Sequence, residues 1–529
     1  MLVALSTVVL ATAAVTGSTW ALLSDSALGG PERMVSAALN PAPAGVTAAS
    51  NGCSGGNQKT NVGLRWTDAQ SAAQSASGNS LITGYNLTRA SSSGGPYAAG
   101  GSVSGSPAPL SFNDSPTVPN SPVALVANTA KQAFPVSESS LTAGGAIAIG
   151  AASNQVNAVQ MTPDGLSAVV AESTAGQVQV LTWSGTAWTV TKTLTVATPT
   201  AVAIDPVPNA LGAYVAYVVS DPGTTANGSV YPVTLSGATS TVGPAIAVEH
   251  QATMTAIVVT PDGAMVYVAN YNSSTISAIA TGTSAVTTVA LPGTVPHPIA
   301  LATTFDSSHV YVADRTNSYI DDITVATNTV NTHIPLAAGA LNDAIVTTSG
   351  SPNAMAILPN GLSLYVAEFG TAEIQVVNTA LAATPDTIAA TISTGAGSQP
   401  IDLAASPNGC LVYVADWPSN NVFSINTTSN AEALVFTTTC WTQDPQPMQV
   451  TPDNQYLVIP ENYSCGDIQL LNTASNAITT ITGVGRAPTM IAIPPVPIWY
   501  ESTATHSLWT SNPSAPVMYP AGWNPGGWQ

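Results

Sequence analysis

Carboxylate side chains recur along this chain at a nearly constant distance from a turn. Seven similar segments each contain a turn built on a proline or a phenylalanine, and in six of them an acidic residue or asparagine follows nine positions later. The seventh segment carries an insertion and places its aspartate further on. The residues concerned are Glu172, Asp221, Asn270, Asp314, Glu368, Asp416 and Glu461. Carboxylates gathered on one face could bind cations or repel anions, whereas the same side chains could instead cap the turns after their strands.

Other patterns that carry chemistry are weak in this sequence. Calcium needs several oxygens within about 2.3–2.6 Å of one ion, and no loop shows the spaced Asp, Asn and Gly pattern that supplies them. The five histidines lack the spacing of a zinc site, and no Gly-x-Ser-x-Gly elbow is present. We therefore expect the acidic residues to be structural turn caps, and we expect no metal, no cofactor and no catalytic residue.

The segments that position these residues share one order of elements. Each has a short apolar strand, a turn such as Pro-Asp-Gly, an alternating strand ending in "YVA", a polar loop, a third strand and a Thr/Val-rich fourth. The turn anchors recur every 43 to 55 residues, at Pro163, Pro206, Pro261, Phe305, Pro359, Pro407 and Pro452. Four antiparallel strands per repeat of this length predict the blades of a β-propeller, which must close into a ring to bury both faces of each blade.

The repeats resemble a known family. "TPDGAMVYVAN", "LPNGLSLYVAE" and "SPNGCLVYVAD" look like the YVTN-type β-propeller repeat of bacterial and archaeal surface-layer and secreted proteins. The resemblance covers residues 140–495 and implies seven blades, in agreement with the seven anchors. The alternative is eight blades, because "APTMIAIPP" at 487–495 restarts a first strand. That strand either closes the ring or begins a degenerate eighth blade with "PIWYESTATHSLW".

The segments outside the repeats suggest further parts. "PAGVTAAS", "NVGLRWTDA" and "ITGYNLTRASSSGGPY" resemble the first strands of a fibronectin type III domain, which implies a small, incomplete β-sandwich over 40–130 with Trp66 and Tyr85 in its core. "SPVALVANTAKQAF" is a poor substitute for the later strand of that family. Residues 496–529 read as a tail rich in Pro, Gly and Trp.

Composition indicates an exported protein. Charged residues make up only 7% of the chain and the net charge is −19, so no basic cluster is available for nucleic acid or an anionic membrane surface. Residues 1–27 form an apolar stretch typical of a signal peptide, or of an N-terminal membrane segment if it is not cleaved. We expect a secreted, cell-surface protein that contacts a membrane only through such an uncleaved segment.

The four cysteines fit an exported chain, where disulfides are permitted. Cys440 and Cys465 fall in loops on the same face of one blade, and we expect a disulfide between them. We expect Cys410 and Cys53 to be free thiols.

Two sets of residues are candidates for ligand binding. Asp402 lies on a first strand, near the crowded centre of the propeller, where other repeats have Ala158, Ala201, Ala256, Ala300 and Ala354. It is either a site residue or a hydrogen-bonded structural aspartate, and His297 and Arg486 could reach the mouth of the same channel. The second set is an aromatic row on the loop face, which could bind a ligand or could only shield strand ends: Tyr271, Tyr319, Phe369, Trp417, Trp441 and Tyr463.

Three functional hypotheses follow. The first is a non-enzymatic cell-surface scaffold or recognition module that binds protein or glycan through its loop face. The second is an enzyme of the lactonase or quinoprotein-dehydrogenase type, since such enzymes also use propellers. The third is a surface-layer or matrix protein that self-associates through the outer strands of its blades.

Overall fold

The computed structural model describes most of the repeat region and separate strands elsewhere. The described residues are 44–50, 62–67, 84–90, 98–104, 111–114, 124–128, 132–137, 140–149, 156–222, 227–250, 254–336, 355–380, 385–417, 419–437, 448–461, 466–484, 488–494, 496–506, 509–510 and 517–521. The chain divides into two compact units. The smaller comprises Met1–Ala48, Val62–Asp114 and Ile498–Met518, and the larger comprises Ala49–Asn61, Ser115–Pro497 and Tyr519–Gln529.

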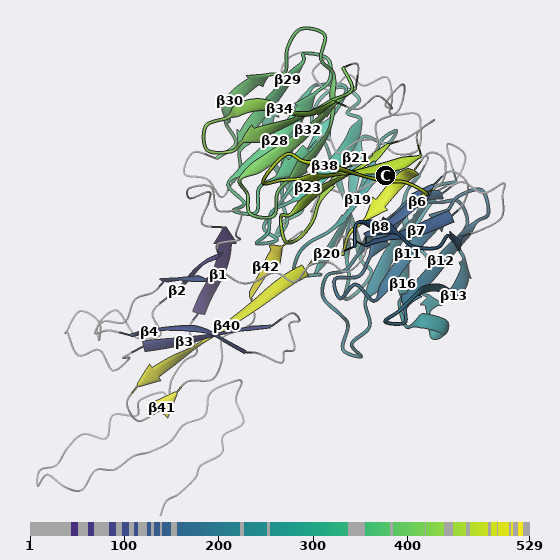
Figure 1. Cartoon of the computed structure of the whole chain (residues 1–529), viewed down its shortest axis with the longest axis horizontal. Coiled ribbons are helices and arrows are strands. Elements are labelled where there is room, and N and C mark those ends of the chain that lie inside the picture. Colours follow the sequence, from purple (N-terminus) through teal and green to yellow (C-terminus); the bar gives the residue numbers. More distant parts are fainter. Residues whose placement is uncertain are drawn as a thin grey trace, which may run out of the picture. The chain divides into compact units, whose positions relative to one another are not determined.

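The larger unit is a β-propeller whose first four blades follow one another along the chain (Figure 1). Blade 1 contains β10 (Val156–Met161), β11 (Ser167–Glu172), β12 (Gln177–Trp183) and β13 (Trp188–Thr195). Blade 2 contains β14 (Pro199–Ile204), β15 (Val215–Ser220), β16 (Asn227–Thr234), η1 (Gly237–Thr239), β17 (Thr241–Val242) and β18 (Ile246–His250). Blade 3 contains β19 (Met254–Val259), β20 (Met265–Asn270), β21 (Thr275–Ala280) and β22 (Val286–Ala290). Blade 4 contains β23 (Pro298–Thr303), β24 (His309–Asp314), β25 (Tyr319–Thr324) and β26 (Thr329–Pro335).

The next three blades repeat this order of strands. Blade 5 contains β27 (Met355–Ile357), β28 (Ser363–Glu368), β29 (Glu373–Asn378) and β30 (Ile388–Ser393). Blade 6 contains β31 (Pro400–Ala405), β32 (Leu411–Asp416), β33 (Asn421–Asn426) and β34 (Ala431–Thr437). Blade 7 contains β35 (Gln449–Val450), β36 (Tyr456–Glu461), β37 (Asp467–Asn472) and β38 (Ile478–Ile481).

An eighth blade closes the ring, so the prediction of seven blades is wrong and the eight-blade alternative holds. Its inner strand is β39 (Pro488–Ala492), which comes from "APTMIAIPP". The strands beside it precede all the repeats: β6 (Ala124–Asn128), β7 (Gln132–Ser137), β8 (Thr142–Ala143) and β9 (Ile147–Ala148). The register pairs Met490 with Ala127 and Ala492 with Leu125. "SPVALVANTAKQAF", which the sequence placed in the N-terminal domain, therefore supplies propeller strands.

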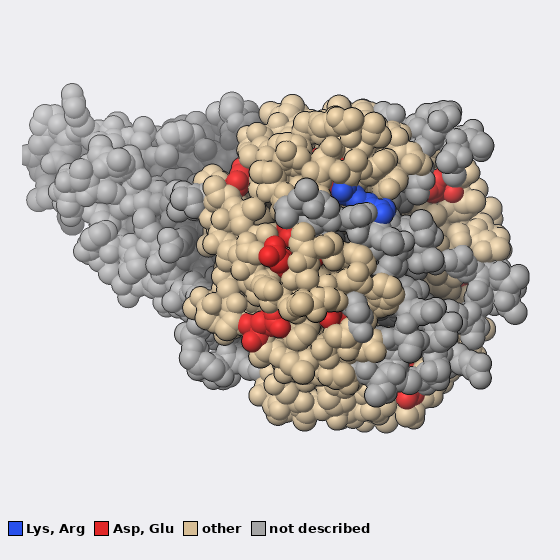
Figure 2. Space-filling model, turned by 90° about the horizontal axis from the view of Figure 1, so that it is seen from above, with Lys and Arg blue, Asp and Glu red and all other residues tan. Residues whose placement is uncertain are grey.

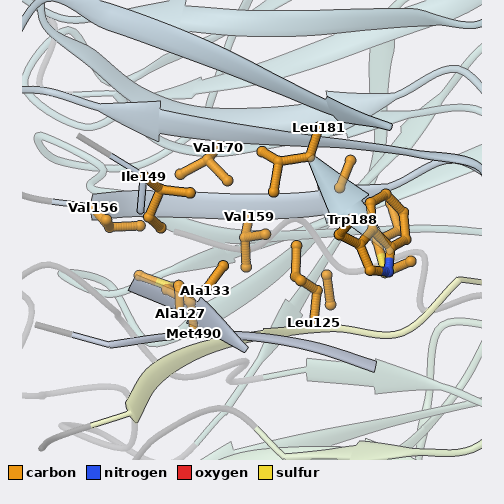
Figure 3. Packing of buried hydrophobic residues seen from close by; sticks show 13 residues of the cluster. Leu125, Ala127, Ala133, Ile149, Val156, Val159, Val170, Leu181, Trp188 and Met490 are labelled. Carbon is orange, nitrogen blue, oxygen red and sulfur yellow. The ribbon is translucent and has the colours of Figure 1, made fainter. Parts of the chain in front are cut away.

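Every pair of neighbouring blades shares a buried hydrophobic cluster, including the pairs that blade 8 forms. Leu125 and Ala127 of blade 8 lie in one cluster with Val159 and Val170 of blade 1 (Figure 3). On its other side, blade 8 packs Val126 against residues of blade 7. The remaining clusters join blades 1 to 7 in order. The core is thus a closed ring of interfaces between sheets, which leaves no blade with an uncovered apolar face.

Two polar contacts explain why the turn residues and the tyrosine of "YVA" recur in the repeats. In the turn after β19, Thr260 donates a hydrogen bond to Asp262 (2.6 Å), the same carboxylate accepts from the Ala264 amide (3.0 Å), and Gly263 has a φ of 71°. The second contact comes from the tyrosine of "YVA", whose hydroxyl reaches the hairpin turn of the next blade. Tyr267 donates to Asn328 (2.7 Å) and Tyr365 donates to Asn430 (3.1 Å).

The smaller unit contains strands from both ends of the chain in two sheets. One sheet has the order β1 (Ala44–Ser50), β2 (Val62–Thr67) and β5 (Ser111–Asp114). The other joins β4 (Ala98–Ser104), β3 (Gly84–Ala90), β40 (Val496–His506) and β41 (Trp509–Thr510), with β42 (Val517–Ala521) also paired to β40. "PIWYESTATHSLW" therefore does not form a propeller blade, since its strand β40 pairs with β3. The fibronectin-like character of this unit stays a prediction.

The proposed signal segment, 1–27, lies outside the described residues. The described ranges contain no helix with the length and hydropathy needed to span a membrane.

Candidate ligand-binding face

Connections between the second and third strands of each blade open on one side of the ring, which we call the loop face. The connections that enter each inner strand open on the same side, because successive strands in a blade are antiparallel. In blades 3 to 6 the second-to-third connection is a turn of four residues, since the register pairs Asn270 with Thr275 and Asp416 with Asn421 at its ends. Blades 4 and 5 have the same register. The fourth residue of each turn has a positive φ, namely Ser274, Ser318, Ala372 and Asn420.

The first residue of these four equivalent turns is large and partly exposed in every case. We call this set the loop-face arc: Tyr271 in blade 3, Arg315 in blade 4, Phe369 in blade 5 and Trp417 in blade 6. Blade 1 has the small residue Ser173 at this position. Three π-faces and one guanidinium thus occupy the same structural position in four consecutive blades.

Tyr271 and Arg315 are linked across the boundary between blades 3 and 4. The Arg315 guanidinium donates to the Tyr271 hydroxyl (3.3 Å), and the Tyr271 ring stacks on His297 with centroids 4.3 Å apart. His297 is held in turn by a hydrogen bond between its Nδ1 and the Thr316 hydroxyl. The Arg315 amide also donates to the His297 carbonyl (3.0 Å), which fixes the turn to the loop entering blade 4. This half of the arc is therefore positioned by several contacts before any ligand binds.

Phe369 and Trp417 form the other half of the arc. Their rings stack with centroids 6.3 Å apart and an interplanar angle of 20°. Both pack against the hydrophobic cluster that joins blades 6 and 7, which includes Tyr413 and Met448. The Trp417 amide donates to the Gln399 carbonyl (3.2 Å), as the Arg315 amide does in blade 4. The aromatic rings are thus anchored on one side and partly exposed on the other.

The other predicted aromatic residues do not extend the arc within the described residues. Tyr319 is the first residue of β25, and its ring stacks on His333 of the outer strand β26 at a centroid distance of 3.5 Å. Trp441 and Tyr463 lie outside the described residues, as does Arg486. The sequence prediction missed Arg315 because it searched for aromatic residues only. Its position directly after "YVAD" was the available signal.

The acidic residues at the ends of the second strands are mostly buried, and Asp314 and Asp416 make the contacts of turn caps. Asp314 accepts hydrogen bonds from the amides of His297 (2.9 Å) and Thr316 (3.1 Å). Asp416 accepts from the Ser398 hydroxyl (2.8 Å) and the Gln399 amide (2.5 Å). The other members are the buried Glu172, Asn270, Glu368 and Glu461 and the partly buried Asp221. Among the described residues, no three His, Cys, Asp or Glu side chains gather closely enough to hold a metal ion.

Asp402 joins two blades. It is fully buried on the inner strand β31, where its partner in register is Ala415. Its carboxylate accepts a hydrogen bond from the Met448 amide (2.7 Å), just before the short inner strand of blade 7. This contact indicates a structural role for Asp402, at a position where other blades have alanine.

Cys410 takes part in a disulfide bond, so the prediction that it is a free thiol is wrong. It follows the Pro-Asn-Gly turn between β31 and β32, and the other cysteine of its disulfide lies outside the described residues. Cys53, Cys440 and Cys465 also lie there, and the predicted pair of Cys440 with Cys465 stays a prediction.

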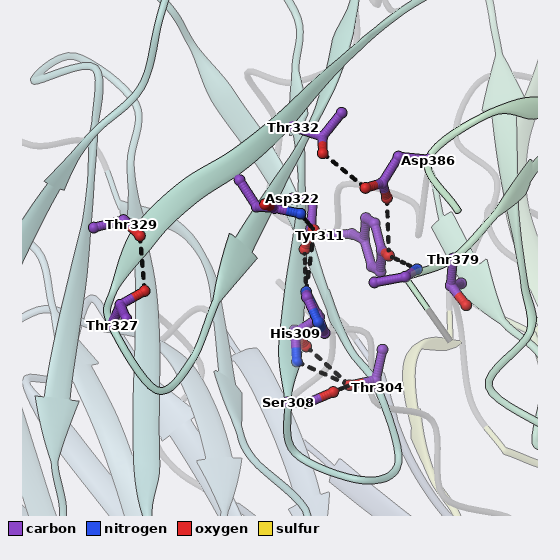
Figure 4. Close-up of polar contacts among 12 residues, drawn as sticks. Thr304, Ser308, His309, Tyr311, Asp322, Thr327, Thr329, Thr332, Thr379 and Asp386 are labelled. Carbon is purple, nitrogen blue, oxygen red and sulfur yellow. Dashed lines mark hydrogen bonds and ion pairs between the residues drawn. The ribbon is translucent and has the colours of Figure 1, made fainter. Parts of the chain in front are cut away.

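Blade 4 contains buried ionisable groups that the sequence prediction missed. Its third strand, "YIDDIT", has two adjacent aspartates where other blades have Gln, Ser, Phe or apolar residues. Asp321 bonds to His333 on one face of the sheet, and Asp322 bonds to His309 (2.8 Å) on the other. Burial raises the pKa of Asp321 to about 6, although His333 lowers it, and the bond to Asp322 raises the pKa of His309. Figure 4 shows Asp322 and His309 together with their polar neighbours.

Asp386 of blade 5 lies close to Asp322 and His309 and bonds to other residues of blade 4 (Figure 4). Its carboxylate accepts hydrogen bonds from Thr332 (2.7 Å) and Tyr311 (3.5 Å), and the Tyr311 hydroxyl accepts from the Ala380 amide (2.6 Å). Burial is the main cause of the raised pKa of Asp386, and the negative charge of Asp322 raises this pKa further. These contacts all lie in the interface between blades 4 and 5 and link the two sheets.

Charges are sparse on the part of the surface that the structure describes. Figure 2 shows a mostly uncharged face with several small acidic patches and one basic patch. A surface of this kind offers a ligand chiefly shape, hydrogen bonds and aromatic contacts.

Comparisons with known proteins support the propeller fold and leave the family open. No protein-family model matches the chain, and no curated protein matches it. Among solved structures, dihydro-heme d1 dehydrogenase NirN is 10% identical over 71% of this chain and 75% of that chain, with a TM-score of 0.53. A putative 6-phosphogluconolactonase from Bacteroides uniformis is 13% identical over 70% of this chain and 98% of that chain, with a TM-score of 0.46. At 10% identity the likeness to NirN is one of fold alone. The strand pairing itself shows that the larger unit is an all-β, eight-bladed β-propeller.

Proposed function

We propose that this protein is an exported recognition module that binds glycan through the loop-face arc. The observation that carries the proposal is the occurrence of Tyr271, Phe369 and Trp417 at one structural position in blades 3, 5 and 6, each partly exposed. Aromatic rings provide flat surfaces for the apolar faces of sugar rings, at a low cost in side-chain entropy. The resemblance of the repeats to YVTN-type propellers and the apolar residues 1–27 support a place outside the cell.

The test compares oligosaccharide binding by the wild type and by two arc variants. We expect Trp417→Ala and Phe369→Ala each to weaken binding about tenfold, because a buried aromatic contact to a ligand contributes on the order of 1–2 kcal/mol. Leu211→Ala is the matched control, since Leu211 is 92% exposed on a connection that opens on the opposite side of the ring. Equal affinities for all four proteins would refute the proposal.

Self-association is a second candidate because the outer strands carry exposed apolar residues. Val286, Ile388, Leu434 and Ile478 lie on the outermost strands of blades 3, 5, 6 and 7 and are 38%, 41%, 56% and 36% exposed. An outermost strand has unpaired backbone groups that could pair with another copy. Sedimentation velocity over a hundredfold range of concentration tests this candidate. Ile388→Lys together with Leu434→Lys should abolish any concentration-dependent increase in sedimentation coefficient.

A further inference from the structure

We propose that Arg315 makes the loop-face arc selective for saccharides that carry isolated carboxylates, such as uronic acids. The inference rests on the proposed function, because it names the ligand class of the same site. It starts from the position of Arg315, which is the only charged member of the arc and stands between Tyr271 and Phe369 in the order of the blades.

The Arg315 guanidinium has unused hydrogen-bonding capacity. A guanidinium has five N–H donors in a planar fork, and in the described part of the chain the one bond that it makes is to the neutral Tyr271 hydroxyl. The ion pairs found among the described residues involve histidines instead. A partly buried cation without a carboxylate partner is unusual in a molecule with a net charge of −19. The remaining N–H donors of Arg315 are therefore available to an anion from outside the chain.

The adjacent carboxylate, Asp314, is engaged by the backbone, and the neighbours of Arg315 restrain its side chain. The neighbouring Asp314 carboxylate is buried and accepts hydrogen bonds from the backbone amides of the turn. Tyr271 holds the guanidinium from the side, and the stacked His297 ring supports Tyr271. Because less side-chain freedom remains to be lost, a carboxylate can bind the fork in a bidentate manner at a reduced entropic cost.

The chemistry of the arc favours a saccharide over an acidic peptide. The arc consists of turns, and turns offer no strand edge for an extended peptide to join. In the order of the blades, Tyr271 stands on one side of the cation and the stacked pair of Phe369 and Trp417 stands on the other. A ligand made of repeated sugar rings, some of which carry a carboxylate, matches that order. The net charge of −19 disfavours densely charged polyanions, so sparse carboxylates are preferred.

The experiment uses oligosaccharides in matched forms. Hexasaccharides of hyaluronan and of partly methyl-esterified polygalacturonate, in which only some rings carry a carboxylate, are titrated in that form and as the full methyl esters, which removes the charge and keeps the rings. We expect the wild type to bind at least one free acid about tenfold more tightly than its ester, as one charge-assisted contact typically contributes. Arg315→Gln should reduce that preference to within about twofold. Arg315→Lys should retain part of the preference.

Lys192→Gln is the matched control, because Lys192 is a cation on the outer strand of blade 1, away from the arc. It should keep the full preference for the free acid. The inference is overturned if Arg315→Gln keeps that preference, or if the wild type shows none, while Trp417→Ala weakens binding of both forms. That outcome leaves the proposed function intact. If no hexasaccharide binds in either form, the proposed function fails and this inference fails with it.

Discussion

At the scale of single residues, the tyrosines of the repeated "YVA" show how one side chain can join two blades. Tyr267, Tyr311 and Tyr365 are buried, and each hydroxyl bonds to a residue in the hairpin turn of the following blade. The turn residue has a positive φ in each case, a conformation that asparagine and aspartate adopt more readily than other residues with a side chain. The tyrosine of "YVA" and the Asn or Asp of the hairpin turn are therefore the two partners of one contact that recurs between blades.

Tyr413 breaks this rule and provides a matched test. It is as deeply buried as the others, yet its hydroxyl has no hydrogen-bond partner among the described residues. We expect Tyr365→Phe to lower the free energy of unfolding by about 1 kcal/mol, because it leaves Asn430 without its donor. Tyr413→Phe should change it by less than about 0.5 kcal/mol or increase it, because it removes an unsatisfied polar atom. Urea denaturation of both variants measures the difference, and equal losses would contradict this account.

The sequence alone allowed the turns and strands of the repeats to be predicted, but it did not reveal which residues are buried or which turns are equivalent. The Pro-Asp-Gly turns and alternating strands are local patterns, so they could be placed without a structure. Burial depends on the whole ring, which is why Asp321 and Asp322 were missed although two adjacent acids in "YIDDIT" were visible. Arg315 was missed because its equivalence to Tyr271, Phe369 and Trp417 is defined by turn geometry rather than by residue type.

At the scale of elements, blade 8 is the part that local patterns could not predict. Its inner strand β39 and its partner β6 are separated by most of the chain, and β6 to β8 lack both the Pro-Asp-Gly turn and the "YVA" ending. Asn128 shows how the two parts are tied, since its side-chain amide donates to the Val484 carbonyl (2.9 Å) across 356 positions.

Removing β39 should open the ring. A chain that ends at residue 484 lacks the strand that covers β6, and it exposes the clusters shared with blades 1 and 7. We expect such a chain to lose cooperative thermal unfolding and to aggregate. A synthetic peptide of residues 485–497 added in trans should restore a cooperative transition, whereas a scrambled peptide should not. Cooperative unfolding of the truncated chain without peptide would show that β39 is dispensable.

At the scale of the whole molecule, the buried acids favour stability in mildly acidic solution. Burial raises the pKa of Asp205 to about 7 and that of Asp321 to about 6, from 3.8 in both cases. In this range the folded state binds more protons than the unfolded state, so stability increases as the pH falls from about 7 toward 4. The raised pKa of His309 acts in the same direction, since its contribution is lost as the pH rises through the folded pKa.

We therefore expect the free energy of unfolding to be roughly 2–4 kcal/mol larger at pH 5 than at pH 8, given about 1.4 kcal/mol for each pKa unit. Thermal denaturation at constant ionic strength over this range provides the measurement. Asp321→Asn should reduce the dependence on pH, because an amide does not titrate. A lower melting temperature at pH 5 than at pH 8 would contradict the prediction. With only 8 Lys and Arg residues and 5 histidines, the chain also acquires little positive charge when its acids are protonated.

The origin of blade 8 also sets the order of events during synthesis. Its strands β6, β7 and β8 leave the ribosome before any repeat, whereas β39 emerges after all seven repeats are made. Each repeat can pair its own strands as it appears, but the circle stays open until residue 492 is available. Closure then happens once, at the end, when β39 pairs with β6. A chain that stops before residue 488 leaves incomplete the two hydrophobic clusters that blade 8 shares with blades 1 and 7.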